Sequence, residues 1–256
     1  MNHYPFLLTL SGILLAGGSV AGTMGPIHQT SERVWVGTLS MGSTWPTSAE
    51  AQTFFLAPEI EKTYAASKLN SALPKLTSAL FDGEVFIGMQ QTIAPVWQAQ
   101  FGLAVAATSN VRLKGEIWDD ADSEFNNLAY SYKIQHTHIA FKGKLLADNG
   151  YWVTPWLSAS AGVAFNNSTS FNNTPLIFEA LANPNFTSHS QTAFTYTVGA
   201  GVQKALTTNW QVGVGYEFAD WGKSQLGRAP DQVLNSGLGQ NHLYTNGLLF
   251  NLTYIT

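Results

Sequence analysis

Cysteine is absent from the 256 residues, which excludes disulfide bonds and thiolate metal sites. Charged residues make up only 11% of the chain, whereas they make up roughly 25% of a typical soluble protein. The net charge of −4 provides no basic excess that would indicate nucleic-acid binding. Beyond the N-terminal segment, no apolar run is long enough for a transmembrane helix. The chain therefore combines few charges with no helical membrane segment.

The N-terminal segment predicts export. Phe6–Val20 is an apolar run too short to span a bilayer, and Ser19-Val20-Ala21 supplies the small residues that precede a cleavage point. We expect a signal peptide over residues 1–21 and one domain over residues 22–256; a buried strand or helix is the alternative for the first segment. An exported chain of this kind is either soluble outside the inner membrane or a β-barrel.

Apolar and polar residues alternate along Tyr196–Phe218, as expected for two strands joined by a tight turn. On the third predicted strand, the same alternation assigns Val111, Leu113 and Ile117 to the apolar face. The pattern predicts eight strands, namely Arg33–Trp45, Gly83–Ile93, Gln98–Ile117, Tyr130–Leu146, Tyr151–Phe165, two within Phe194–Phe218, and His242–Tyr254.

Short and long connections alternate along the chain. The tight ones are Ala94–Val96, Asp148–Gly150 and Thr207–Asn209, which contain the Pro, Asn and Gly that turns require. The long ones are Pro46–Asp82, Asp119–Ala129, Asn166–Thr192 and Gly222–Asn241. This order places all tight turns at one end of the sheet, which is typical of an outer-membrane barrel with short periplasmic turns and long external loops.

Tryptophans lie near the predicted strand ends. Trp35 and Trp45 are ten residues apart, which corresponds to a rise of about 25 Å for a tilted strand and matches the apolar band of a barrel. The predicted aromatic girdle consists of Trp35, Trp45, Trp97, Trp118, Trp152, Trp156, Trp210 and Trp221. The apolar faces are therefore expected to contact lipid. The sequence predicts an all-β fold, an eight-stranded antiparallel up-and-down transmembrane β-barrel.

The eight alternating strands, the export signal and the last strand, GLLFNLTYIT, resemble the small outer-membrane β-barrel family of OmpA-like transmembrane domains and opacity-type surface proteins. The resemblance covers Arg33–Thr256. It implies the outer membrane of a Gram-negative-type bacterium, contact with lipid and lipopolysaccharide, and recognition of the C-terminal strand by the barrel assembly machinery. Family members usually end on an aromatic residue, whereas here Tyr254 is followed by Ile255-Thr256.

Charged and imidazole side chains fall on the predicted lumen face. Buried charges must pair, and we expect Glu84 or Glu217 to pair with Lys142. An interior plug of salt bridges and a narrow, gated ion path are the two interpretations. The predicted lumen network consists of Glu84, Arg112, Lys114, Glu116, His136, His138, Lys142, Lys144 and Glu217.

Two groups of residues have some features of metal sites. His136 and His138 share a strand face, but the sequence provides no evident third ligand, so lumen packing is expected. The acidic residues of the second long loop do not fit a calcium-binding loop, because Phe125 stands where glycine is required. A solvated loop is expected, with loose divalent binding near lipopolysaccharide as the alternative, over Asp119, Asp120, Asp122 and Glu124.

The long loops indicate a structural or surface-interaction, adhesin-like function, with a host or matrix ligand as one hypothesis. FFLAPEIEKTYAASKL in the first loop is expected to extend a hairpin or form a short helix, and NTPLIFEALANPNF in the third exposes apolar groups unless the loops pack together. A narrow pore is the alternative, and a lipid A-modifying enzyme is a third class. Enzymatic activity is not expected, because His is nearly absent from the lipid-facing surfaces apart from His242. No cofactor is expected, and a soluble barrel would have the opposite face polarity.

Overall fold

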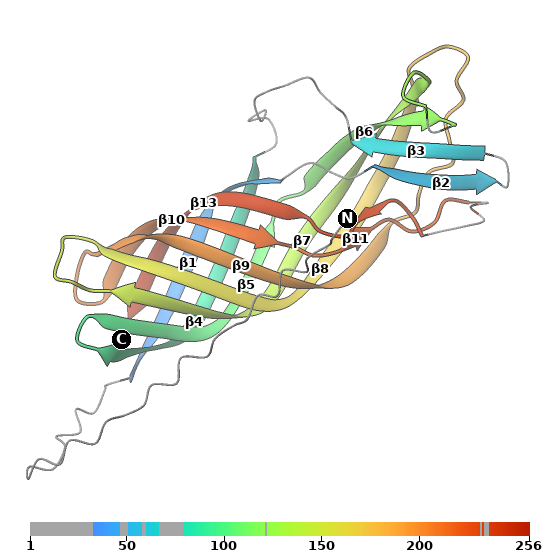
Figure 1. Cartoon of the computed structure of the whole chain (residues 1–256). Coiled ribbons are helices and arrows are strands. Elements are labelled where there is room, and N and C mark those ends of the chain that lie inside the picture. Colours follow the sequence, from blue (N-terminus) through green and yellow to red (C-terminus); the bar gives the residue numbers. More distant parts are fainter. Residues whose placement is uncertain are drawn as a thin grey trace, which may run out of the picture. The chain divides into compact units, whose positions relative to one another are not determined.

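The computed structural model describes residues 33–46, 51–57, 60–66, 79–120, 122–230, 232 and 236–256 (Figure 1). The signal peptide expected over residues 1–21 lies outside these residues. Within them, no helix has the length and hydropathy needed to cross a bilayer.

Eight long strands form a closed antiparallel ring in the described part of the chain. Closure is made by the first and last of them, which pair from Val36 opposite Ile255 to Pro46 opposite Thr245. The all-β, eight-stranded barrel predicted from the alternation is confirmed. In ring order the strands are β1 (Arg33–Pro46), β4 (Leu80–Ala94), β5 (Trp97–Thr108), β7 (Asn126–Ala147), β8 (Thr154–Pro175), β9 (His189–Ala205), β10 (Trp210–Asp220) and β13 (Tyr244–Ile255).

The tight connections gather at one end of the ring. They join β4 to β5, β7 to β8 and β9 to β10. At this end Asn209 donates from its side-chain amide to the Ile255 carbonyl over 2.8 Å, which holds the β9–β10 turn against the last strand. The long connections leave the opposite end, called here the loop end (Figure 1).

An additional sheet extends the barrel at the loop end. It contains β2 (Gln52–Ala57), β3 (Ile60–Ala66) and β6 (Val111–Asp119), and β6 pairs with the outer half of β7. The first long loop therefore forms the hairpin that was one of its two expected structures. A second small hairpin, β11 (Ser224–Gln225) with β12 (Gly239–Gln240), lies in the last long loop.

The predicted third strand, Gln98–Ile117, is broken at Ser109-Asn110 into β5 and β6. Both pieces pair with β7, but the register shifts by one residue, from Ala107 opposite Thr137 to Val111 opposite Ile134. A one-residue shift sends each following side chain to the other face. The prediction that Val111, Leu113 and Ile117 face lipid was therefore wrong: Val111 and Ile117 are buried inside, and Leu113 packs against the same interior cluster.

The outer surface of the ring is apolar and its interior is largely polar. Large side chains such as Phe141, Leu157 and Ile87 are more than half exposed on the outside. Thr38, Gln100 and Ser160 are buried inside. This polarity is the inverse of a soluble barrel and is that of a membrane barrel with lipid outside.

The aromatic girdle differs in part from the prediction. Trp35, Trp97, Trp152 and Trp210 are exposed at the tight-turn end, and Trp45 is half-buried at the loop end, as expected. Trp156 and Trp221 are instead buried inside, because they occupy inward-facing positions of the alternation. Trp118 lies ten residues beyond the end of β5, in the added sheet and away from the lipid boundary. At the loop end of β9, β10 and β13, the girdle is formed by neighbouring rings of Tyr196, Phe218 and Tyr244.

Glycines on β9 and β10 make room for Trp156 in the lumen. A Cβ atom added to Gly201 or Gly215 would overlap atoms of the Trp156 ring. Because the ring lies across these two strands, the inward-facing glycines are a packing requirement of the barrel.

We predict that Gly215→Ala lowers barrel stability by about 1–3 kcal/mol, the usual range for overpacking. The measurement is the urea concentration at which half of the refolded barrel is unfolded. The folded fraction is read from the mobility difference between boiled and unboiled samples. Trp156→Ala removes the ring, so Gly215→Ala should have a smaller effect in that background. If Gly215→Ala lowers stability equally with and without Trp156, overlap with the Trp156 ring is not the cause of the destabilisation.

Candidate functional site

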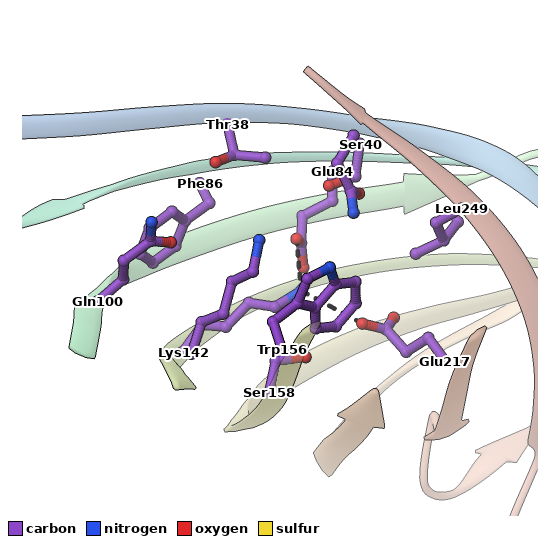
Figure 2. Close-up of a pocket in the computed structure, with 12 residues that line it drawn as sticks. Thr38, Ser40, Glu84, Phe86, Gln100, Lys142, Trp156, Ser158, Glu217 and Leu249 are labelled. Atoms are coloured by element: carbon purple, nitrogen blue, oxygen red, sulfur yellow. Dashed lines mark hydrogen bonds and ion pairs between the residues drawn. The ribbon is translucent and has the colours of Figure 1, made fainter. Parts of the chain in front are cut away.

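The centre of the lumen contains a buried ion triad (Figure 2). Lys142 Nζ on β7 lies 2.6 Å from Glu84 Oε1 on β4 and 3.2 Å from Glu217 Oε2 on β10. The sequence suggested one carboxylate or the other as the partner, and the structure places both on Lys142. The side chains are at most 11% exposed, so each charge depends on the others for compensation. The triad thereby links three strands across the barrel interior.

A small cavity of about 30 Å³ lies beside the triad. Ser40, Gln100 and Ser158 contribute polar groups to its wall, and Phe86 and Leu249 contribute apolar ones. Among the lining atoms, Gln100 Oε1, Trp156 Nε1 and Ser158 Oγ have no hydrogen-bond partner within the protein. A cavity of this volume, next to several unpaired polar groups, is large enough to hold a water molecule.

Toward the tight-turn end, Lys144 occupies a different environment from Lys142. Its ammonium lies 2.6 Å from Gln203 Oε1 and 4.6 Å from the centre of the Trp156 ring. Gln203 in turn donates to Gln211 over 2.6 Å, and Gln90, Gln98 and Gln100 form a second amide chain. The lumen at this end is therefore filled by amides and one cation held by an aromatic face.

Toward the loop end, His136 and His138 form a hydrogen-bonded pair with Asn166. His136 Nδ1 lies 2.7 Å from Asn166 Oδ1, and its Nε2 lies 2.9 Å from His138 Nδ1. The Asn166 amide donates to the carbonyls of Trp221 and Lys223, and the Trp221 ring stacks on His136 at 4.4 Å. Both imidazoles thus have packing and hydrogen-bond partners, and the described residues contain no group of three or more ligands suitable for a metal.

Three residues assigned to the lumen lie elsewhere. Arg112 and Lys114 are exposed on the outer face of β6, and Glu116 is partly exposed on that face. The register shift at Ser109-Asn110 is the reason, since it reverses the faces of β6 relative to β5. The assignment of these three side chains to the lumen network was wrong.

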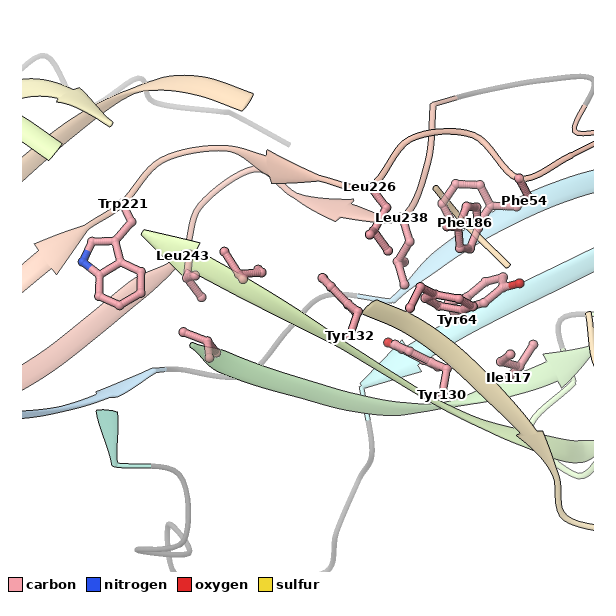
Figure 3. Packing of buried hydrophobic residues seen from close by; sticks show 14 of the residues in the cluster. Phe54, Tyr64, Ile117, Tyr130, Tyr132, Phe186, Trp221, Leu226, Leu238 and Leu243 are labelled. Carbon is pink, nitrogen blue, oxygen red and sulfur yellow. The ribbon is translucent and has the colours of Figure 1, made fainter. Parts of the chain in front are cut away.

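A large apolar cluster fills the interior at the loop end (Figure 3). Its members come from β4, β7, β8 and β10 of the ring, from β2, β3 and β6, and from the connections that follow β8 and β10. Tyr64 of β3 contacts the rings of Phe54, Tyr130 and Phe186 at centroid distances of 5.3 to 5.5 Å. The cluster, called here the aromatic plug, contains Phe54, Tyr64, Leu80, Val111, Ile117, Leu128, Tyr130, Tyr132, Ile134, Phe171, Phe186, Ala219, Trp221, Leu226, Ala229, Leu238 and Leu243.

The acidic cluster of the second long loop is tied to its surroundings by Asp119. This carboxylate forms an ion pair with Lys62 of β3 and accepts a hydrogen bond from Asn127 over 2.7 Å. Partial burial raises the pKa of Asp119, but the bonds from Lys62 and Asn127 prevail and hold it below its ordinary value. Asp122 caps the turn by accepting from the Glu124 amide at 2.9 Å, and Asp120 is exposed.

The third long loop exposes a compact apolar segment beyond the end of β8. Leu176, Ile177, Phe178 and Leu181 are exposed, and Phe178 is 99% exposed. Asn173, which is buried, bonds through its amide to the Asn183 carbonyl and accepts from the Asn183 amide, both at 2.8 Å. The segment is thus held at its base. Phe54 and Tyr64 of the first loop are instead buried in the plug. The first loop therefore buries its large apolar side chains, whereas the third exposes them.

Sequence reasoning missed Asp82 and Trp156 as lumen residues, and it did not predict that the lumen glutamines form hydrogen-bonded chains. Asp82 is buried near the triad and has one unpaired carboxylate oxygen, but the sequence interpretation placed it at the end of a long loop. Trp156 was detectable, because Leu157 on the outer face fixes its neighbour as inward-facing. Amides have no charge or motif that would distinguish a lumen chain from a solvated strand face.

We predict that Lys142→Met is strongly destabilising, by about 3–5 kcal/mol, because it leaves two buried carboxylates without a cation. Replacing the whole triad by Lys142→Met, Glu84→Gln and Glu217→Gln should recover much of this loss. The measurement is urea unfolding of the refolded barrel. A triple variant as unstable as Lys142→Met would contradict an electrostatic origin of the effect.

A second prediction concerns Asp119 and acid. Because the pKa of Asp119 is lower in the folded state, its stabilisation is present above the ordinary value of 3.8 and is lost as the pH falls through the folded pKa. The protection of the β3 amides, measured relative to their intrinsic exchange rate at each pH, should fall in this acidic range. Asp119→Asn should already exchange faster at neutral pH and show little further change. An identical acid response in that variant would assign the effect to another group.

No protein-family model and no curated protein sequence matches the chain. Solved structures of small outer-membrane barrels are similar to it at low sequence identity. Neisserial surface protein A is 16% identical, with a TM-score of 0.42 over 86% of this chain and 96% of that one. OprG from Pseudomonas aeruginosa is 12% identical, with a TM-score of 0.38 over 88% and 96%. Ail, the attachment invasion locus protein of Yersinia pestis, is 10% identical, with a TM-score of 0.33 over 86% and 98%. The ring closure, the face polarity and the loop asymmetry give this chain the architecture of an eight-stranded outer-membrane β-barrel.

Proposed function

We propose that the protein is a surface-interaction barrel whose external sheet and loops bind an extracellular partner, such as a host or matrix macromolecule. The observation that carries the proposal is the exposed segment Leu176–Leu181, which projects from a rigid base. Exposed apolar side chains that are contiguous and rimmed by polar residues are typical of interaction sites. Binding, without catalysis, is the function proposed for this surface.

The base of the segment supports a binding function because packing and hydrogen bonds hold it at both ends. Phe171 precedes the segment and Phe186 follows it, and both rings are buried in the aromatic plug at a centroid distance of 5.0 Å. The Leu176 amide also donates to the Asn127 carbonyl over 2.8 Å. A segment fixed at both ends loses less conformational entropy on binding than a free loop.

The alternative of a narrow pore is less well supported. An ion that passed through the aromatic plug would lose its hydration without compensation, because the plug is built from apolar side chains. Below the plug, the triad fully engages Lys142 with two carboxylates. The paired charges and amide chains of the lumen favour interior packing over conduction, so the external surface is the better candidate.

The test replaces the exposed apolar side chains. Leu176→Ser, Ile177→Ser, Phe178→Ser and Leu181→Ser in one variant should reduce attachment of expressing cells to host cells and matrix proteins by at least about tenfold, since a few apolar anchors carry most of an interface's binding energy. Surface abundance and heat-modifiable mobility should be unchanged, because these side chains lie outside the plug.

Phe125→Ser serves as the matched control, since Phe125 is also exposed on an external turn but lies on a different connection. It should bind as the unmodified protein does. Unchanged attachment by the fourfold variant, with normal surface abundance, would overturn the proposal. Equal loss in both variants would point to general surface hydrophobicity instead of a site.

A further inference from the structure

The reversed face of β6 places three cations together on the outside of the barrel. Arg112 and Lys114 are exposed on β6, and Lys133 on β7 lies directly opposite Arg112 in the sheet register. Opposite residues in antiparallel strands have Cα atoms about 5 Å apart, and alternate residues along a strand about 7 Å. The three side chains, called here the basic cluster, can therefore converge on one anionic group. β6 and β7 lie side by side at the loop end in Figure 1.

The three cations of the basic cluster form no ion pair within the described part of the chain. Among the described residues, no carboxylate lies within ion-pair distance of any of the three cations; the ion pairs involve Lys62, Lys142 and His242 instead. The acid nearest along the outer face is Glu116, two residues beyond Lys114 on the same strand. Like charges directly opposite each other destabilise a sheet, so the pairing of Arg112 with Lys133 favours an external anion.

Arg112 and Lys133 lie just beyond the height of the lipid headgroup layer, and Lys114 lies two residues farther out. The lipid-facing apolar surface ends on β8 at Phe165, which lies opposite Thr137 of β7. Lys133 is four residues beyond Thr137 on β7, which corresponds to a rise of about 9 Å for a tilted strand. The polar layer over the hydrocarbon is roughly 5 to 8 Å thick. Long basic side chains can reach back into it.

We propose that Arg112, Lys114 and Lys133 bind a phosphate group of the outer-leaflet glycolipid, lipopolysaccharide. A guanidinium can donate two parallel bonds to phosphate, and the two ammonium groups add charge beside it. The neighbouring outward side chains on β7 and β8, Gln135, Asn167 and Thr169, carry hydrogen-bonding groups for the sugar. The cluster faces the membrane surface, whereas the proposed partner-binding segment lies in the loop between β8 and β9.

The experiment measures lipopolysaccharide binding to the refolded full chain in detergent. The protein should bind phosphorylated lipopolysaccharide more tightly than the same lipid after phosphatase treatment. The double variant Arg112→Gln with Lys133→Gln should bind the phosphorylated form about thirtyfold more weakly, and Lys114→Gln alone about fivefold, as expected for surface cations near anionic lipid. Heat-modifiable mobility confirms that each variant is folded.

The matched control is Arg33→Gln with Lys204→Gln. Both residues are exposed cations at the tight-turn end, so the double variant removes the same charge from the opposite membrane face, and it should bind as the unmodified barrel does. Inorganic phosphate should not compete at millimolar concentration, because the site requires the lipid at the barrel surface. Equal binding of both lipid forms, equal weakening in the control, or preference for a heparin fragment over the lipid would overturn the proposal.

Discussion

The structure depends on the hydrogen-bonded closure between β1 and β13. In lipid, a backbone amide or carbonyl that has no partner in the protein finds no water to form a hydrogen bond with. A sheet that spans a membrane must therefore have no free edge. The register from Val36–Ile255 to Pro46–Thr245 removes the edges that the first and last strands would otherwise present. Closure also determines the rest of the interior, because it confines Lys142, Glu84 and Glu217 to a volume in which each charge must find its partner.

The register break at Ser109-Asn110 divides the molecule into two regions with different solvents. Below it, apolar residues face outward to lipid and polar residues fill the lumen. Above it, β6 follows the rule of a soluble sheet, with Val111 and Ile117 inside and Arg112 outside. The one-residue register shift therefore places apolar side chains outside where the barrel meets lipid and inside where it meets water. In the part that meets water, the aromatic plug is the hydrophobic core.

Period-two alternation was sufficient to predict the number of barrel strands, their lipid-facing side and the segregation of short and long connections. It also placed Lys142 correctly relative to its carboxylates, because Glu84 and Glu217 share the inward parity. It failed for Arg112, Lys114 and Glu116, since a bulge at Ser109-Asn110 has no strong signature in a run that remains alternating. It failed for Trp156 and Trp221 because the preference of tryptophan for membrane interfaces was given more weight than their parity. The plug contacts between Tyr64 and Phe186 are long-range, so local pattern could not predict them.

Phe171 and Phe186 lie on either side of the exposed segment Leu176–Leu181, and both are anchored in the plug. These two aromatic rings belong to the interior, whereas the segment between them is exposed. Within the segment, the exposed side chains of Leu176, Ile177, Phe178 and Leu181 contribute little to the interior, so replacing them should cost little folding free energy. The barrel thus supplies a fixed frame that holds a short surface segment at both of its ends.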